Sequence, residues 1–64
     1  MRVNGEDLVL ENPVTLQKFL EQEGYEIARV AVEKNGEIIL KSAFTTEMLK
    51  DNDKLEIVSF IGGG

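Results

Sequence analysis

The chain has 64 residues, of which 12 are acidic and 7 basic, and its net charge is −5. This length allows one small domain with a core too small to enclose a substrate cavity, so we do not expect an independent enzyme. Without cysteine or histidine the chain can form neither disulfides nor thiolate metal sites, and it lacks the commonest general base. The acidic balance predicts that the protein binds neither nucleic acid nor membranes. The absence of a transmembrane run or signal segment predicts a cytoplasmic protein, and we expect it to hold no metal.

The first segment, from Arg2 to Leu10, predicts two short strands around the turn dipeptide Asn4-Gly5. Asn12-Pro13 then interrupts the pattern.

A helix of about three turns follows. Thr15 is the expected N-cap, and Leu16, Phe19 and Leu20 form an apolar stripe at helical spacing. Gly24 supplies the left-handed residue that ends the helix, with Tyr25 in position for a Schellman ending.

The second half predicts a further hairpin and a last strand. Residues 29–34 and 37–40 form the arms of the hairpin around Asn35-Gly36. Residues 42–50 are expected to form a short helical turn with irregular packing, residues 51–53 a polar turn, and residues 54–61 the last strand.

This order of elements predicts an α+β domain of the β-grasp, or ubiquitin-like, fold. We expect a mixed sheet of four to five strands, with one main helix packed on one face and a short second helix. In this fold the last strand lies centrally, beside the first.

The chain ends in three glycines, so we divide it into a β-grasp domain (residues 1–61) and a flexible glycine tail (residues 62–64). A thread without side chains can enter a channel that would exclude any residue with a Cβ. The terminal carboxylate is then the expected working group. The alternative is a linker remnant or a frayed end.

Alternation along the last strand places Leu55 and Ile57 toward the helix, and Val58 and Phe60 on the open face. An exposed Val-Phe pair beside the tail predicts a partner surface. The alternative is that Phe60 folds back over a sheet edge.

The remaining charges carry no distinct prediction. The acidic residues Glu21, Glu23 and Glu26 could recognise a basic partner, but we interpret them as a solvated face. The lysines, including Lys34, are expected to serve solubility only.

Together, the residues from Val30 to Ile38 with their Asn-Gly hairpin, and the run from Leu55 through Phe60-Ile61 to Gly62-Gly63-Gly64, resemble the ThiS family of sulfur carriers in thiamin biosynthesis. Val3-Asn4-Gly5-Glu6 and the helix after Thr15 also match, so the resemblance covers nearly the whole chain.

This resemblance implies a specific chemistry. Gly64 is the residue whose carboxylate is adenylated and then converted to a thiocarboxylate, while Gly62 and Gly63 enter partner active sites, beside contacts made by Val58, Phe60 and Ile61. The implied partners are an E1-like adenylating enzyme of the ThiF type, which uses ATP and magnesium, a cysteine persulfide sulfur donor, and a thiazole synthase of the ThiG type. The chain itself binds no cofactor and acts as a cosubstrate.

Two other functions stay open. The small subunit of molybdopterin synthase shares the fold and the glycine ending but donates sulfur to a pterin. A β-grasp interaction module without covalent chemistry would have no use for the tail.

Overall fold

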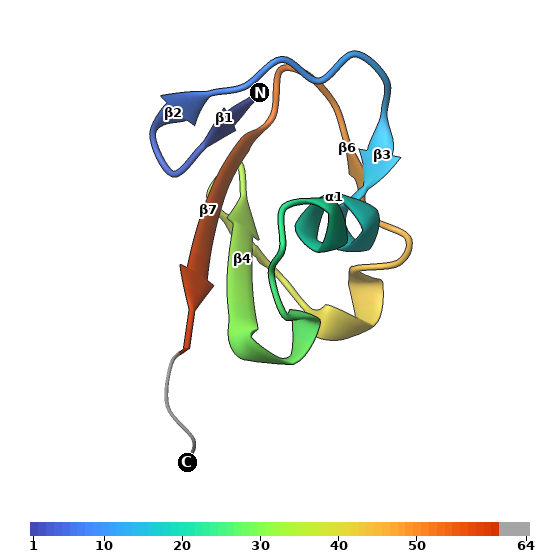
Figure 1. The fold of residues 1–64 in the computed structure, drawn as a ribbon, viewed down its shortest axis with the longest axis vertical. Coiled ribbons are helices and arrows are strands. Elements are labelled where there is room, and N and C mark those ends of the chain that lie inside the picture. The colour runs from blue at the N-terminus through green and yellow to red at the C-terminus, as the bar shows by residue number, and fades with distance from the viewer. Residues whose placement is uncertain (61–64) are drawn as a thin grey trace.

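The computed structural model describes residues 1–60, which form a mixed five-stranded sheet with α1 (Leu16–Gln22) packed on one face (Figure 1). The strand order is β2-β1-β7-β4-β5, and the central strand β7 runs parallel to β1 and antiparallel to β4. The predicted β-grasp order, with the last strand central beside the first, is therefore confirmed. The strands of this sheet are β1 (Arg2–Val3), β2 (Glu6–Asp7), β4 (Val30–Lys34), β5 (Glu37–Ile39) and β7 (Lys54–Ser59).

Both predicted Asn-Gly hairpins are present. Asn4 and Gly5 have φ angles of 51° and 84°, and Asn35 and Gly36 have φ angles of 53° and 84°. Two consecutive left-handed residues make a turn whose twist matches that of the flanking strands, which is why this dipeptide joins β1 to β2 and β4 to β5.

The beginning of α1 is capped by residues from two parts of the chain. The Thr15 hydroxyl accepts a hydrogen bond from the Lys18 N–H at 3.2 Å, as predicted for an N-cap. The Leu16 and Gln17 N–H groups donate to the carbonyls of Glu47 and Phe44, at 2.8 and 3.0 Å. The loop after β5 thus satisfies donors that a helix leaves free in its first turn.

The end of α1 is the predicted Schellman motif. The Tyr25 N–H donates to the Leu20 carbonyl at 2.9 Å, and the Gly24 N–H donates to the Glu21 carbonyl at 3.1 Å. Gly24 has a φ of 84° and ends the helix after seven residues, about two turns rather than the three that we expected.

The segment between β5 and β7 contains the expected short helical turn and one pairing that was not expected. The helical turn is a 3-10 turn, η2 (Lys41–Ala43), and a second 3-10 turn, η1 (Ile27–Arg29), precedes β4. Beyond η2, β6 (Met48–Leu49) pairs antiparallel with β3 (Val14–Thr15) in a separate two-stranded ladder. Strands of two residues are too short to show alternation, so sequence periodicity could not reveal this pairing.

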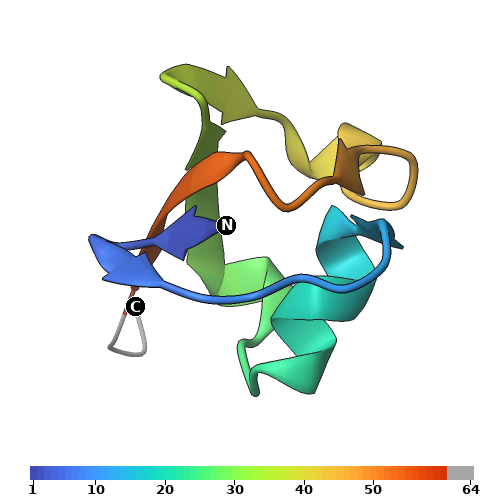
Figure 2. The same cartoon turned by 90° about the horizontal axis from the view of Figure 1, so that it is seen from above.

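The core lies between the sheet and α1 (Figure 2). Helix residues Leu16 and Leu20 are fully buried, and the inward side chains of β4 and β7 cover them from the sheet. The buried apolar residues are Met1, Leu16, Phe19, Leu20, Val30, Val32, Phe44, Leu49, Leu55 and Ile57.

Candidate functional site

The two sides of β7 differ in the way that the alternation predicts. Leu55 is fully buried and Ile57 is 6% exposed, whereas Val58 is 57% and Phe60 58% exposed. The strand therefore binds the core with one set of side chains and presents the other set to solvent.

The β4 edge of β7 is paired to the end of the strand, whereas the β1 edge is held only as far as Ile57. On one edge β7 pairs with β4 from Lys34–Leu55 to Val30–Ser59, and the Phe60 N–H donates to the Arg29 carbonyl at 2.7 Å. On the other edge β1 ends at Val3, and the Asn4 side chain continues the contact by binding the backbone of Ile57. The chain thus reaches residue 60 from the central strand of the sheet, which β4 pairs along its length.

The proposed tail residues Gly62, Gly63 and Gly64, together with Ile61, lie outside the described residues. Their roles as the modified group and its approach remain predictions from the sequence.

The open face of the sheet carries more apolar surface than the sequence analysis assigned to it. Val58 pairs across the strands with Ala31, which is also exposed, and Ile38 on β5 is 73% exposed. Leu40 lies two residues beyond Ile38 and is exposed as well, so alternation places it on the same side. We call these four residues, Ala31, Ile38, Leu40 and Val58, the open-face patch.

The sequence-based prediction of a strand over residues 37–40 does not assign Ile38 and Leu40 to either face. The strand alternation Ile38-Ile39-Leu40 could have found them, since Ile39 packs against the core and its two neighbours must then point outward.

Acidic side chains border the open-face patch. Glu33 on β4 lies directly opposite Glu56 on β7, and the same Glu33 is paired with Ile38 on β5. Like charges in opposite positions repel each other. A basic group on a partner would relieve this repulsion while its apolar surface covers the open-face patch.

Phe60 lies at the end of the sheet. It borders a hollow of about 220 Å³ together with Tyr25 and Arg29, which follow the helix. Phe60 is thus exposed, as expected. It lies just beyond the strand that carries Val58, and it also borders the residues that follow α1.

The three glutamates around the helix end do not act as one group. Glu26 pairs with Arg29 at 3.0 Å, Glu21 is exposed, and Glu23 borders a hollow between α1 and the first hairpin. All three are exposed, as the interpretation as a solvated face predicts, and Glu23 in addition borders this hollow.

Lys34 has a structural role that the sequence analysis did not assign. Its Nζ lies 2.6 Å from the Glu47 carboxylate and donates to the Met48 carbonyl at 3.1 Å, which ties the main sheet to the ladder of β3 and β6. The hydrogen bond to Glu47 raises the pKa of Lys34, and the charge of Asp53 adds to this effect against the opposing cost of burial. The expectation that the lysines serve solubility alone is wrong for Lys34.

Within residues 1–60 no three acidic side chains are arranged to hold a metal ion. No helix in the same range is long and apolar enough to span a membrane.

Comparison with known proteins gives a consistent result. The model of the ThiS family matches residues 1–64. A sulfur carrier protein ThiS from Bacillus subtilis is 38% identical over 65 residues, covering 100% of this chain and 98% of the relative. The crystal structure of a thiamine biosynthesis protein, ThiS, from Geobacter metallireducens superposes with a TM-score of 0.80 at 30% identity, covering 98% of this chain and 96% of that one.

A longer relative matches as well. A thiazole synthase from Paramagnetospirillum magneticum is 44% identical over 62 residues, which are 97% of this chain but 19% of that protein. The chain thus spans about a fifth of the length of the thiazole synthases that it matches.

Proposed function

This chain belongs to the ThiS family, a family of thiamin biosynthesis, and we propose that it carries sulfur as a thiocarboxylate on Gly64. The observation that carries the proposal is the match of the ThiS family model through residue 64, which includes the three glycines. The position of β7 supports it, because β7 is the central strand and β4 pairs with it as far as Ser59, next to the segment that leads to the glycines.

The chemistry explains why a chain without cysteine or histidine can take part. A carboxylate is a poor acceptor of nucleophiles because its leaving group would be oxide. In the proposed first step the Gly64 carboxylate attacks the α-phosphorus of ATP, pyrophosphate leaves, and an acyl-adenylate forms. The partner enzyme and its magnesium ion stabilise the charge of this step.

The second step brings in the sulfur. The terminal sulfur of a cysteine persulfide attacks the acyl carbon and AMP leaves, which gives an acyl disulfide. A second thiol then attacks the cysteine sulfur of that bond, so that a disulfide forms and the thiocarboxylate is released. Gly64 contributes the carbonyl carbon, and the chain acts as a cosubstrate and not as the catalyst.

The partner surfaces follow from the exposed side chains. We assign the open-face patch, with Val58 beside the tail, and Phe60 at the end of the sheet to contacts with an E1-like adenylating enzyme. Ile61, Gly62 and Gly63 would lie in its active-site channel. The reactions would take place in the cytoplasm.

Thiazole synthase is the proposed acceptor of the sulfur. The proteins named thiazole synthase contain a segment that is 34% to 44% identical to this chain, so in them a ThiS-like segment and the rest of a thiazole synthase belong to one polypeptide. Such a fusion is advantageous when the two parts act in the same reaction, because linkage raises their effective concentration.

Intact-mass spectrometry tests the proposal. The chain is incubated with a ThiF-type enzyme, ATP, magnesium and a persulfide source, and we expect the mass increase that results when sulfur replaces one oxygen. The variant lacking Gly63 and Gly64 should keep its mass and its unfolding midpoint. An unchanged mass of the parent chain, with AMP formation also absent, would contradict the carrier chemistry and favour a non-covalent module.

A binding experiment separates the two carrier pathways. Immobilised chain carrying the thiocarboxylate should retain thiazole synthase and transfer sulfur to it. Retention of the large subunit of molybdopterin synthase in its place would favour the pterin pathway.

A further inference from the structure

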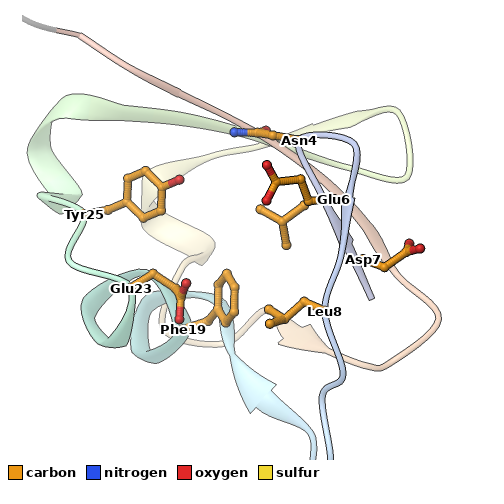
Figure 3. Close-up of a pocket in the computed structure, with 8 residues that line it drawn as sticks. Asn4, Glu6, Asp7, Leu8, Phe19, Glu23 and Tyr25 are labelled. Atoms are coloured by element: carbon orange, nitrogen blue, oxygen red, sulfur yellow. The ribbon is translucent and has the colours of Figure 1, made fainter.

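A second hollow, of about 270 Å³, lies between the β1–β2 hairpin and the end of α1, away from the open-face patch (Figure 3). Apolar side chains from both elements line it, among them Val3 from β1 and the aromatic rings of Phe19 and Tyr25. Phe19 is almost fully buried, whereas Tyr25 is half-buried and forms a wall. The hollow is thus lined by polar as well as apolar groups, and Tyr25 supplies the aromatic ring that a ligand can reach.

Two carboxylates enter the same space from opposite sides. Glu6 comes from β2, Glu23 from the C-cap of α1, and Figure 3 shows both carboxylates and the Tyr25 hydroxyl directed toward the hollow. Asp7 points away, and its carboxylate lies 3.1 Å from the Arg2 Nε. Within residues 1–60 neither Glu6 nor Glu23 is engaged in an ion pair, so two unpaired negative charges border the hollow together with the Tyr25 ring.

Both walls are held in place by hydrogen bonds. Asn4, which lines the hollow, binds Ile57 through its side-chain amide with contacts of 2.7 and 3.1 Å. On the other wall the Schellman bond from the Tyr25 N–H to the Leu20 carbonyl sets the end of the helix that carries Glu23. A site whose walls are already ordered loses little conformational entropy when a ligand binds.

We propose that this hollow receives an arginine side chain of a partner protein. A guanidinium is planar, stacks on aromatic rings and can donate to two carboxylates, which suits a hollow bordered by Tyr25, Glu6 and Glu23. The apolar part of the lining, which includes Val3 and Leu8, suits the methylene stem of the same side chain. With a net charge of −5, the chain as a whole also attracts a basic partner.

The hollow adds a second contact to the one proposed for the open-face patch. Asn4 joins its wall to Ile57 of β7, the strand that also carries Val58 of the open-face patch. Only the identity of the partner rests on the proposed function: we take it to be the adenylating enzyme.

Nuclear magnetic resonance titration tests the site without any partner protein. The probe is N-acetyl-arginine amide, and its neutral control is N-acetyl-citrulline amide, which has nearly the same shape. We expect shifts of the Asn4, Glu23 and Tyr25 amides with the arginine compound and none of comparable size with citrulline. Equal shifts with both compounds, or shifts confined to other residues, would overturn the proposal.

Variants connect these shifts to the carboxylates. Glu23→Gln should weaken binding of the arginine compound about threefold, the effect of one exposed ion pair, and Glu6→Gln with Glu23→Gln about tenfold. The matched control is Glu21→Gln, since Glu21 is an exposed glutamate of the same helix that does not line the hollow. If Glu21→Gln weakened binding as much as Glu23→Gln, the binding would reflect general attraction to an acidic chain, and the proposed site would be contradicted.

A final measurement concerns the partner. The Glu6→Gln, Glu23→Gln double variant should bind the adenylating enzyme at least about fivefold more weakly than the Glu21→Gln variant, with a smaller dependence on salt. Unchanged affinity would overturn the role of the hollow in that complex. Failure of the carrier chemistry would appear in the mass experiment and would leave the arginine titration unaffected, so the two proposals fail separately.

Discussion

The side chain of Asn35 at the tip of the β4–β5 hairpin donates a hydrogen bond from Nδ2 to Oδ1 of Asp53 at 3.0 Å, and so joins that hairpin to the turn before β7. The other carboxylate oxygen of Asp53 accepts from the Lys50 N–H at 2.8 Å. Asp53 is the buried acidic residue among those described, at 8% exposure. The turn that the sequence marks only as polar is thus an internal junction.

Asp53→Ala should lower the free energy of unfolding by about 1–3 kcal/mol, because it leaves the Asn35 amide and the Lys50 N–H without their acceptor. Urea denaturation measures the change. The control is Asp7→Ala, whose exposed carboxylate pairs, among residues 1–60, with exposed Arg2, so its cost should stay below about 1 kcal/mol. Equal costs for the two variants would show that the junction does not stabilise the fold.

Stability should fall in acid because of two aspartates. Burial raises the pKa of Asp53, but the hydrogen bonds from Asn35 and Lys50 and the charge of Lys34 outweigh it, and the pKa lies below its usual value. The pKa of Asp51 is lowered by the Leu10 N–H and the N-terminal amine. A carboxyl group with a lowered pKa in the folded state contributes stability above its unfolded pKa, and this stability is lost as the pH falls through the folded pKa.

The unfolding midpoint should therefore decline as the pH drops below about 4, the usual value for aspartate. Thermal unfolding between neutral and strongly acidic pH measures it. In Asp53→Ala the decline should be shallower than in the parent. A parallel pH profile for the variant would contradict the assignment to Asp53.

Asn4→Gly should loosen one position of β7. Glycine accepts the φ of 51° at this turn, so the substitution removes the two side-chain bonds to Ile57 without adding backbone strain. We expect the hydrogen-exchange rate of the Ile57 amide to rise roughly tenfold, beyond the change that a general loss of stability causes at other amides. The amides of β4 provide the internal reference, and an Ile57 amide that stays protected would show that water replaces Asn4 at no cost.

Leu55→Ala and Phe60→Ala should separate folding from binding. Leu55 is fully buried, and its truncation should cost about 2–5 kcal/mol of unfolding free energy. Phe60 is 58% exposed, and its truncation should cost less than about 1 kcal/mol of unfolding free energy. The same truncation should weaken binding to the adenylating enzyme by at least about 1 kcal/mol. Denaturation midpoints and calorimetric affinities decide this, and a Phe60→Ala variant that unfolds as readily as Leu55→Ala would place that ring in the core.

Ile38→Ser tests the part of the open-face patch that lies on the edge strand. Ile38 is 73% exposed, so the unfolding midpoint should change little, whereas the affinity for the adenylating enzyme should fall by about 1 kcal/mol or more. Val9→Ser is the matched control, because Val9 is equally exposed but lies outside the sheet. If both variants bind as well as the parent, the open face is not the contact surface.

The sequence by itself determined those features that depend on neighbouring residues. Asn4-Gly5 and Asn35-Gly36 prescribe their turns because the two residues together adopt left-handed conformations, and Thr15 and Gly24 mark where α1 begins and ends. Alternation in the last strand was long enough to assign Leu55 to the core and Val58 to solvent. The order of these elements is that of the β-grasp fold, in which the sheet covers the apolar side of the helix.

Only the tertiary structure decided which distant residues meet. The ladder of β3 and β6 has two residues on each side, too few for a period, and it forms because Val14 and Leu49 are brought together over the core. The bonds of Asn4 to Ile57 and of Lys34 to Glu47 join groups whose partners a linear pattern does not specify. The same holds for Glu6 and Glu23: each reads as an ordinary surface charge, and only the packing of a hairpin against the end of a helix directs both carboxylates into one hollow.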